Sequence, residues 1–297
     1  MAFHRICSKN CRDDLGNCIL PAEDGMAAQC VGPWVEDKYS FLERYLDATR
    51  QVRKKFTDKN NSVFIDLFAG PGCCIIRQEN REIQNGAMRV ANNINVPFSE
   101  YFFFDLHKLN IEALEKRIGN RTNRHFICTD SNKISKKVVD SLLTKPFRYH
   151  FVYMDPFGPE ALPFRTVKEF AKLKRVDLFI HFPIGAIRRN LPNWRENDFG
   201  ILDEFLGTSV WRNDIENLRQ GKTLSTLLKL YEKQLSNAGF PIEGLRMASS
   251  DKTVFSSLPV VSVRNTQEVE LYTLVLASKN GIAQKIWNSV ILIEPSG

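Results

Sequence analysis

The sequence predicts an α/β fold in which a mostly parallel, seven-stranded sheet is covered by helices and ends in an antiparallel hairpin. Three observations lead to this prediction. Short apolar runs end in acidic or glycine-rich residues, helical patterns separate these runs, and the last two strand-like segments have only a short polar connection. A chain of 297 residues is long enough for one such domain with additions.

Five apolar runs have the composition of strands that are buried on both faces of a parallel sheet. They cover residues 62–68, 99–105, 123–130, 149–155 and 175–182. Apolar residues at helical spacing fill residues 34–56, 86–94, 107–118, 132–143 and 163–173. Residues 258–264 and 269–278, joined by Asn-Thr-Gln-Glu, have the pattern of the antiparallel hairpin.

Composition and charge indicate the compartment and the class of partner. No apolar run reaches the roughly 20 residues of a membrane helix, and the first residues lack the apolar core of a secretory signal. We therefore expect a cytoplasmic protein with no membrane partner. The formal charge of +7 favours a polyanionic partner, DNA or RNA, because basic charge attracts phosphate backbones.

A glycine-rich turn and several carboxylates follow the predicted strands at their carboxyl ends, where open α/β sheets bind ligands. Gly70 and Gly72 allow the backbone to turn tightly and to approach a ligand without Cβ clashes. A single aspartate at a strand end is often only a helix cap or turn former, but here the signals recur in order. The predicted ligand-binding residues are Asp66, Phe68, Ala69, Gly70, Gly72, Asp105 and Asp130.

Five parallel strands followed by a hairpin resemble the Rossmann-like sheet of class I methyltransferases, whose last strand inserts antiparallel. The resemblance implies S-adenosylmethionine as cofactor. Asp105 is then placed for the ribose hydroxyls, Asp130 for the adenine amino group, and Asp66 for the loop or the ammonium group. The sequence contains neither the GxGxxG dinucleotide fingerprint nor a P-loop, which disfavours a dehydrogenase.

The fourth strand ends in Asp155-Pro156-Phe157-Gly158, at the place where this fold carries out its chemistry. Amino-methyltransferases have an Asp/Asn-Pro-Pro-aromatic turn there, and the segment is closer to the Asp-Pro-Phe/Tyr-Gly turn of tRNA guanosine N2-dimethyltransferases. We predict Asp155, Pro156 and Phe157 as catalytic residues, with Asp155 aligning a target amine and Phe157 stacking on the base. The alternative is a turn that only ends the strand.

Lys and Arg outnumber acidic residues over residues 165–195, a segment that ends beside the expected active site. An Arg188-Arg189-Asn190 turn and Arg195 are predicted to bind nucleic acid through its phosphates, with Trp194 beside them for base stacking. A solvated helix face explains the remaining lysines equally well. His181 follows a buried strand, and we expect it to be a core histidine.

Four cysteines lie in the first thirty residues, and a group of thiols in a reducing compartment suggests a metal rather than disulfides. The predicted ligands are Cys7, Cys11, Cys18 and Cys30, with His4 as a possible substitute. Zn(II) is the default, a [4Fe–4S] cluster is an alternative, and so is the absence of any metal. We therefore divide the chain into a Cys-rich extension, residues 1–32, and a methyltransferase-like domain, residues 33–297.

Ordered motifs along most of the chain resemble the three-Cys-motif partner protein family. They are VGPWVEDK (31–38), FLERYLDA (41–48), FIDLFAGPG (64–72), YMDPFGP (153–159), DLFIHFPIGAIRRN (177–190), FLGTSVWR (205–212) and LASKNGIAQKIWN (276–288). The resemblance implies a bacterial, class I methyltransferase-like protein encoded beside a radical-SAM-like partner. It supports the cofactor loop and the turn at Asp155, but the stretch from 73 to 85 is longer than the fold requires.

Two functions follow from this reading of the sequence. The first is an S-adenosylmethionine-dependent N-methyltransferase that acts on a nucleic acid base. The second is a non-catalytic partner or specificity subunit that keeps the fold to bind nucleic acid or a radical-SAM-like protein.

Overall fold

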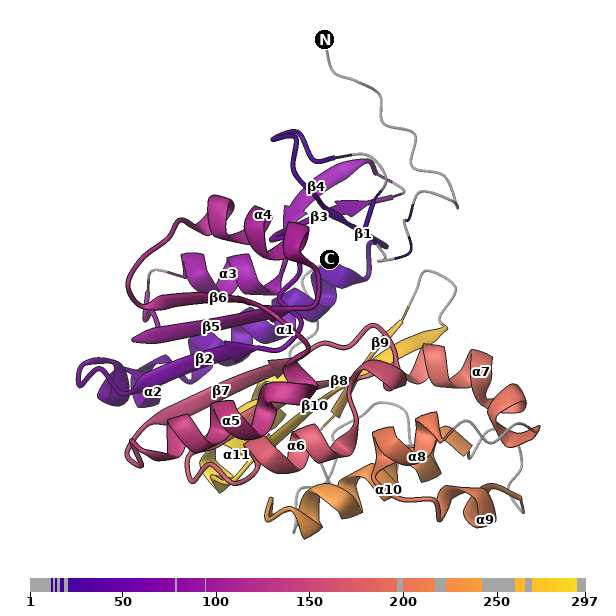
Figure 1. The fold of residues 1–297 in the computed structure, drawn as a ribbon. Helices are drawn as coiled ribbons and strands as arrows, with labels where there is room; N and C mark the ends of the chain where they lie inside the picture. The colour runs from indigo at the N-terminus through magenta and orange to yellow at the C-terminus, as the bar shows by residue number, and fades with distance from the viewer. Residues whose placement is uncertain are drawn as a thin grey trace. The chain divides into compact units, whose positions relative to one another are not determined.

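A computed structural model describes residues 12, 14, 17–18, 21–77, 79–93, 95–196, 200–216, 223–241, 260–264 and 269–292, and Figure 1 draws its ribbon. The chain divides into two compact units, residues 1–131 and 132–297. The strands form a three-stranded sheet, β1-β3-β4, and a seven-stranded sheet with the order β6-β5-β2-β7-β8-β10-β9.

In the first unit, β2 (Ser62–Asp66) pairs in parallel with β5 (Glu100–Asp105), and β5 pairs in parallel with β6 (Arg124–Cys128). Every residue of β2 is buried, as expected for a parallel strand covered on both faces. The helices of this unit are α1 (Val35–Ala48), α2 (Arg50–Thr57), α3 (Gly86–Asn92) and α4 (Lys108–Ile118). α5 (Ser131–Leu143) begins at the last residue of the unit. The helical pattern over 34–56 thus corresponds to two helices that meet at Thr49.

The long stretch after the glycine turn is a hairpin rather than a loop. β3 (Cys73–Ile76) pairs antiparallel with β4 (Arg81–Gln84), and on its other side β3 pairs in parallel with β1 (Gln29–Val31). Residues 29–31, assigned from the sequence to the Cys-rich extension, therefore form part of a sheet with the segment that follows the glycine turn.

In the second unit, β7 (Tyr149–Met154) pairs in parallel with β8 (Val176–Phe182). β10 (Glu270–Ser278) pairs antiparallel with both β8 and β9 (Val260–Arg264). The last strand thus inserts antiparallel next to the fifth parallel strand. The predicted α/β fold with a mostly parallel, seven-stranded sheet, that of class I methyltransferases, is confirmed.

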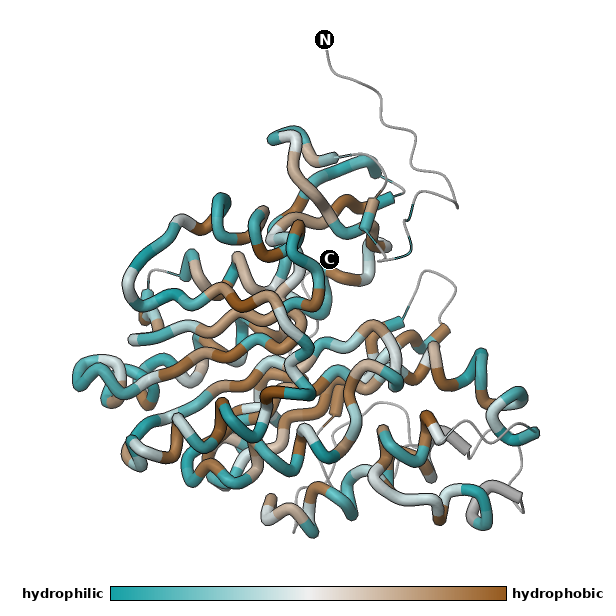
Figure 2. Tube along the Cα trace, viewed as in Figure 1, coloured by the Kyte–Doolittle hydropathy of each residue, from teal (hydrophilic) through white to brown (hydrophobic). Residues whose placement is uncertain are grey.

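In the described part of the second unit, further helices follow α5. They are η1 (Pro159–Ala161), α6 (Phe164–Phe170), α7 (Ile184–Glu196), α8 (Ile201–Leu206), α9 (Trp211–Glu216), α10 (Thr223–Asn237) and α11 (Gly281–Ile291). Apolar and polar residues alternate along α5 and α7 (Figure 2), as in helices that bury only one face. In the described part of the chain, no helix combines the length and apolar character needed to cross a membrane.

Gly185 sets the distance between the first turn of α7 and strand β10. A Cβ at this position would lie 2.8 Å from the carbonyl oxygen of Leu271, a backbone atom that cannot rotate away. We expect Gly185→Ala to destabilise the protein by about 1–3 kcal/mol, the usual range for overpacking. Urea unfolding measures the effect. The matched control is Gly281→Ala, also at the start of a helix, where a Cβ would meet no atom within 4 Å; equal losses for both variants would contradict the expectation.

Candidate functional site

The glycine turn after β2 has the backbone conformation that its composition predicts. Gly70 and Gly72 have φ values of 60° and 90°, a region in which side chains are strained. Asp66 supports the turn, because its Oδ1 accepts the backbone N–H of Phe68 at 3.0 Å. Ala69 donates its N–H to the carbonyl oxygen of Phe104 in the neighbouring strand at 2.8 Å. The turn is therefore fixed to the carboxyl ends of both strands.

Asp105, the last residue of β5, is held against this turn. Its Oδ2 accepts the N–H of Gly70 at 2.9 Å. Its Oδ1 accepts the N–H of His107 at 2.8 Å and the Nδ2 of Asn110 at 3.2 Å. A carboxylate has about four acceptor positions, so these three bonds leave one on Oδ2. This oxygen suits a ligand hydroxyl that approaches the glycine turn.

Phe68 and Asp130 lie at the ends of their strands, as predicted, and both are half-buried. Asp130 follows β6 and immediately precedes α5. The N–H of Thr129 donates to the carbonyl oxygen of Asp105 at 2.9 Å, which connects the ends of β5 and β6. The first unit thus brings the predicted cofactor residues to the carboxyl ends of three adjacent strands.

Asn85 belongs to the site although the sequence analysis did not select it. Its buried side chain donates from Nδ2 to the carbonyl oxygen of Ala69 at 2.7 Å. Its backbone N–H donates to the carbonyl oxygen of Gly72 at 2.9 Å. Asn85 also caps α3, since its Oδ1 accepts the N–H of Met88 at 3.1 Å. One residue therefore fixes both the glycine turn and the start of the following helix.

Gln29 in β1 lies directly against the glycine turn. A Cβ built on Gly70 would lie 3.0 Å from its Nε2 and 3.1 Å from its Oε1. The parallel pairing of β1 with β3 aligns Gln29 with Cys74, just beyond the turn. The N-terminal segment therefore contributes a polar side chain to the surroundings of the predicted cofactor loop.

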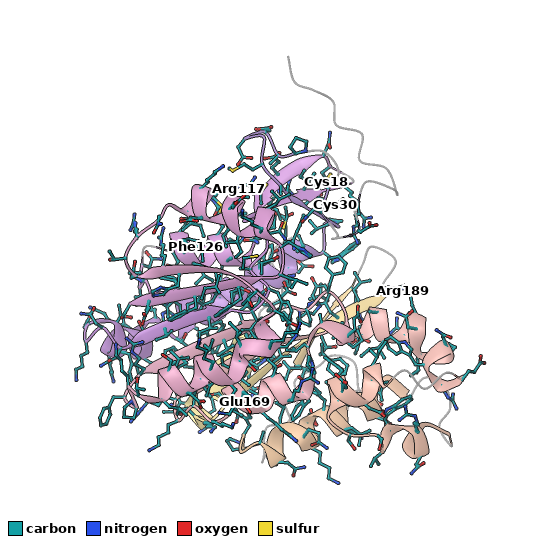
Figure 3. All side chains as sticks on the ribbon, viewed as in Figure 1. Cys18, Cys30, Arg117, Phe126, Glu169 and Arg189 are labelled. Atoms are coloured by element: carbon teal, nitrogen blue, oxygen red, sulfur yellow. The ribbon has the colours of Figure 1, made fainter. Side chains whose placement is uncertain are left out.

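Arg117 in α4, labelled in Figure 3, joins that segment to the glycine turn. Its Nη1 donates to the carbonyl oxygen of Pro71 at 2.5 Å and to that of Ala27 at 2.7 Å. Its Nε and Nη2 pair with the two carboxylate oxygens of Asp24, each at 2.7 Å. This interaction lowers the pKa of Asp24 from its ordinary value. With only 5% of its side chain exposed, Arg117 is a buried link between two segments far apart in sequence.

In the second unit, Asp155 is part of a hydrogen-bonded group at the end of β7. Its Oδ1 lies 2.5 Å from Nδ1 of His181, and its Oδ2 accepts the hydroxyl of Tyr153 at 3.1 Å. The ring of Tyr272 meets the His181 ring edge to face, with 4.1 Å between the centroids. His181, expected from the sequence to be a core histidine, is largely buried but contacts the predicted catalytic aspartate.

The two other residues of the predicted catalytic turn differ in exposure. Pro156 is buried, whereas 66% of Phe157 is exposed. A large aromatic side chain at the surface after the strand end is compatible with stacking on a planar ligand.

The last part of the basic segment is helix α7, which corrects the predicted Arg188-Arg189-Asn190 turn. These three residues lie within α7, and Asn190 donates from Nδ2 to the carbonyl oxygen of Ala186 one turn earlier. Arg188 lies 3.5 Å from the carboxylate of Glu270. Arg189, labelled in Figure 3, is exposed.

Arg195, in the last turn of α7, is exposed as well. Trp194 is only 7% exposed, so the base-stacking role expected for this indole is wrong. Arg188, Arg189 and Arg195 are thus all exposed on α7, and Arg188 is the one that pairs with Glu270.

Cys18 and Cys30 lie in one buried apolar cluster together with Cys73 (Figure 3 labels Cys18 and Cys30). Cys7 and Cys11 lie outside the described residues. Among the residues that the structure describes, no three His, Cys, Asp or Glu side chains are placed to hold a metal ion. Burial, followed by the charge of Glu82, raises the pKa of the Cys73 thiol to about 12. The zinc or iron–sulfur site stays a prediction.

Comparisons with known proteins give similarity at the level of structure alone. No protein-family model and no curated protein matches the chain, so membership of the three-Cys-motif partner family stays a prediction. Similar solved structures include M. jannaschii TYW2 in complex with AdoMet, with a TM-score of 0.40, 10% identity and coverage of 89% of this chain and 86% of that chain.

A second similar structure is Trm1 from Pyrococcus horikoshii with S-adenosyl-L-methionine. Its TM-score is 0.39 at 10% identity, over 90% of this chain and 61% of that chain. A third, the methyltransferase domain of bacterial CtHen1, has a TM-score of 0.38 at 11% identity, over 80% of this chain and 99% of that chain. Similarities this low say nothing about the activity or substrate of this chain.

Proposed function

We propose that the protein is an S-adenosylmethionine-dependent N-methyltransferase that acts on a base of DNA or RNA. The observation that carries the proposal is the hydrogen bond from the Gly70 N–H to Asp105 Oδ2. This bond joins the glycine turn, whose residues Gly70 and Gly72 have no side chains, to the carboxylate of Asp105. The bonded oxygen, Oδ2, keeps one further acceptor position. The carboxylate suits the hydroxyls of a ribose, and the turn suits a neighbouring group that must approach the backbone closely. An adenosine sulfonium contains both kinds of group.

Each residue has a distinct role under this proposal. Bound S-adenosylmethionine supplies an electrophilic methyl group. Asp105 accepts ribose hydroxyls, and the turn from Gly70 to Gly72 admits the amino acid part of the cofactor. In the second unit, Asp155 aligns the target amine and Phe157 stacks on the base. Arg189 offers an exposed guanidinium group for phosphate contact.

Calorimetry with S-adenosylmethionine tests the cofactor half of the proposal. We expect the wild type to bind and Gly70→Asp to lose detectable binding, because the new carboxylate would meet Gln29 and the carboxylate of Asp105. Asp105→Asn should weaken binding by roughly 10- to 100-fold. A hydrogen bond to a charged group contributes about 1.5–3 kcal/mol, and its loss raises Kd by about that factor.

The matched control is Gly200→Asp. Gly200 has a φ of 66°, close to that of Gly70, but a Cβ there meets no atom within 4 Å. This variant carries similar backbone strain and should keep wild-type affinity. Absence of binding by the wild type, or equal loss in Gly200→Asp, contradicts the proposed cofactor site.

Transfer of a labelled methyl group tests the substrate half. We offer denatured DNA and unmodified RNA in separate reactions and identify the methylated nucleoside by mass spectrometry. Asp155→Ala is expected to lower the rate by about 10²-fold or more while cofactor affinity stays unchanged. Methylation of protein but of neither nucleic acid contradicts the proposed substrate.

A non-catalytic role as a nucleic acid-binding or protein-binding partner subunit is the second candidate. The contact between Gln29 and Gly70 favours it, because a side chain of the protein itself lies against the turn that a cofactor would approach. Under this function the wild type would fail to bind S-adenosylmethionine, and Arg189→Glu would abolish nucleic acid binding while Asp155→Ala would not.

A further inference from the structure

We propose that His181 is the proton acceptor of the methyl-transfer reaction and that Asp155 acts through it as a positioning residue. The inference rests on the proposed function and extends it, because that function uses Asp155 to align the target amine and names no proton acceptor. Four residues of the second unit carry it: Tyr153 and Asp155 from β7 and its end, His181 from β8, and Tyr272 from β10.

Strand register brings the aspartate and the histidine together. β7 and β8 are parallel, and Met154 pairs with Ile180, so the next residue on each strand is Asp155 and His181. The Oδ1 of Asp155 lies 2.5 Å from Nδ1 of His181, and their side chains are only 15% and 12% exposed. Low exposure limits competition from water and strengthens a charged hydrogen bond.

This hydrogen bond decides which nitrogen of the imidazole is basic. An ionised carboxylate has no proton to give, so Nδ1 of His181 donates to Asp155. In the neutral ring Nε2, which is buried, then carries no proton and is able to accept one from an amine placed against it. The carboxylate also stabilises the imidazolium that forms, as in other carboxylate–histidine pairs.

Both tyrosines restrict the movement of this pair. The hydroxyl of Tyr153 donates to Oδ2 of Asp155 at 3.1 Å, so each oxygen of the carboxylate has a partner within the chain. The Tyr272 ring, 5% exposed, packs at 81° against the imidazole with 4.1 Å between centroids. The aspartate is thus bonded on both oxygens, and the imidazole is held in one orientation.

The exocyclic amine of the base forms a new N–C bond to the methyl group, and the C–S bond breaks with its electron pair going to sulfur. The amine nitrogen loses one proton, which Nε2 of His181 receives. The products are the methylated base, a neutral thioether and a protonated His181.

The tautomer of His181 is the first test and needs no substrate. The chain contains five histidines, so ¹⁵N-histidine labelling with His181→Gln as the assignment variant is practical. We expect long-range ¹H–¹⁵N spectra at pH 8 to show Nδ1 protonated and Nε2 unprotonated, and Asp155→Ala to abolish this preference. A proton on Nε2 in the wild type overturns the inference whether or not the protein is a methyltransferase.

Kinetics is the second test, with S-adenosylmethionine and the nucleic acid that accepts the labelled methyl group. We expect His181→Ala to lower kcat by about 10²- to 10⁴-fold, the usual contribution of a general base, with KM unchanged. Added imidazole should restore part of the rate to His181→Ala but not to Asp105→Asn, a result that a merely structural histidine would not give. An unchanged kcat, or no recovery with imidazole, overturns the inference.

A second histidine–carboxylate pair gives the matched control. His125 Nε2 lies 3.0 Å from the Oε1 of Glu100 in the first unit, on strands β6 and β5. His125→Ala should leave kcat within about twofold of the wild type.

Cofactor binding separates the two proposals. A wild type that shows the expected tautomer but binds no S-adenosylmethionine refutes the proposed function, and a wild type that binds it but has a proton on Nε2 refutes only the role of His181.

Discussion

Acidification from pH 6.5 to about 4 is expected to remove about 3 kcal/mol of stability through one residue, His150. Burial lowers the pKa of His150 from 6.5 to about 4, with the nearby charge of Arg148 adding to the effect and the hydrogen bond to the Arg175 carbonyl oxygen opposing it. Its Nδ1 lies 3.2 Å from that oxygen, and among the described residues its buried Nε2 has no hydrogen-bond partner.

The direction follows from the protons bound in each state. Between pH 6.5 and 4 the unfolded chain takes up a proton at His150 and the folded protein does not, so stability falls as pH falls. Urea unfolding of wild type and His150→Asn at pH 7 and pH 4.5 isolates this contribution. Asn keeps a donor for the carbonyl oxygen but does not titrate. A wild-type loss no larger than that of His150→Asn would contradict the assigned pKa.

Replacing Arg117 with methionine is expected to cost about 2–4 kcal/mol and to weaken S-adenosylmethionine binding by about tenfold or more. Methionine fills part of the space but leaves the carbonyl oxygens of Ala27 and Pro71 without their donor. A buried acceptor left unsatisfied costs about 1–3 kcal/mol, and Asp24 also loses its partner. Binding weakens because the glycine turn loses one of its attachments.

Urea unfolding and calorimetry measure the two effects. Lys116→Met is the matched control, because Lys116 is the preceding residue of α4 and is exposed, so its replacement should change stability by no more than about 0.5 kcal/mol. Loss of stability in Arg117→Met with unchanged affinity would mean that Arg117 supports the N-terminal segment without positioning the glycine turn.

Much of the fold was predictable from the sequence because buried parallel strands form continuous apolar runs. The run at 62–68 corresponds to β2, and the runs at 149–155 and 175–182 correspond to β7 and β8, with ends that differ by two residues at most. The hairpin was predictable because a short polar connection separates two strand-like segments.

Helix α7 and the hairpin of β3 and β4 escaped prediction for identifiable reasons. α7 contains Gly185 and Pro192, residues that normally end helices and that argue against a helix in the sequence. The helical spacing of the apolar Ile184, Ile187 and Trp194 is too weak a signal to offset them. β3 and β4 are four residues each, too short for a clear periodicity, and half of β4 is exposed.

The candidate site was predictable only where one segment contains the whole signal. The glycine turn with Asp66 is such a segment, and so is the turn at Asp155. Gln29 and Arg117 contact the glycine turn from distant segments, so no local pattern connects them to it. Pairing of His181 with Asp155 depends on the register between β7 and β8, which apolar runs without alternation do not define.

The position of β10 has a consequence for synthesis on the ribosome. β8 forms its second ladder with β10, a strand that follows the whole helical excursion from α7 to α10. Until that segment has emerged, a nascent chain exposes the amides and carbonyls along one side of an apolar strand, a template for pairing with other chains. Closure of this ladder over such a sequence separation is slow. Chaperones that shield strand edges should therefore raise the yield of folded protein most when they act before β10 has been translated.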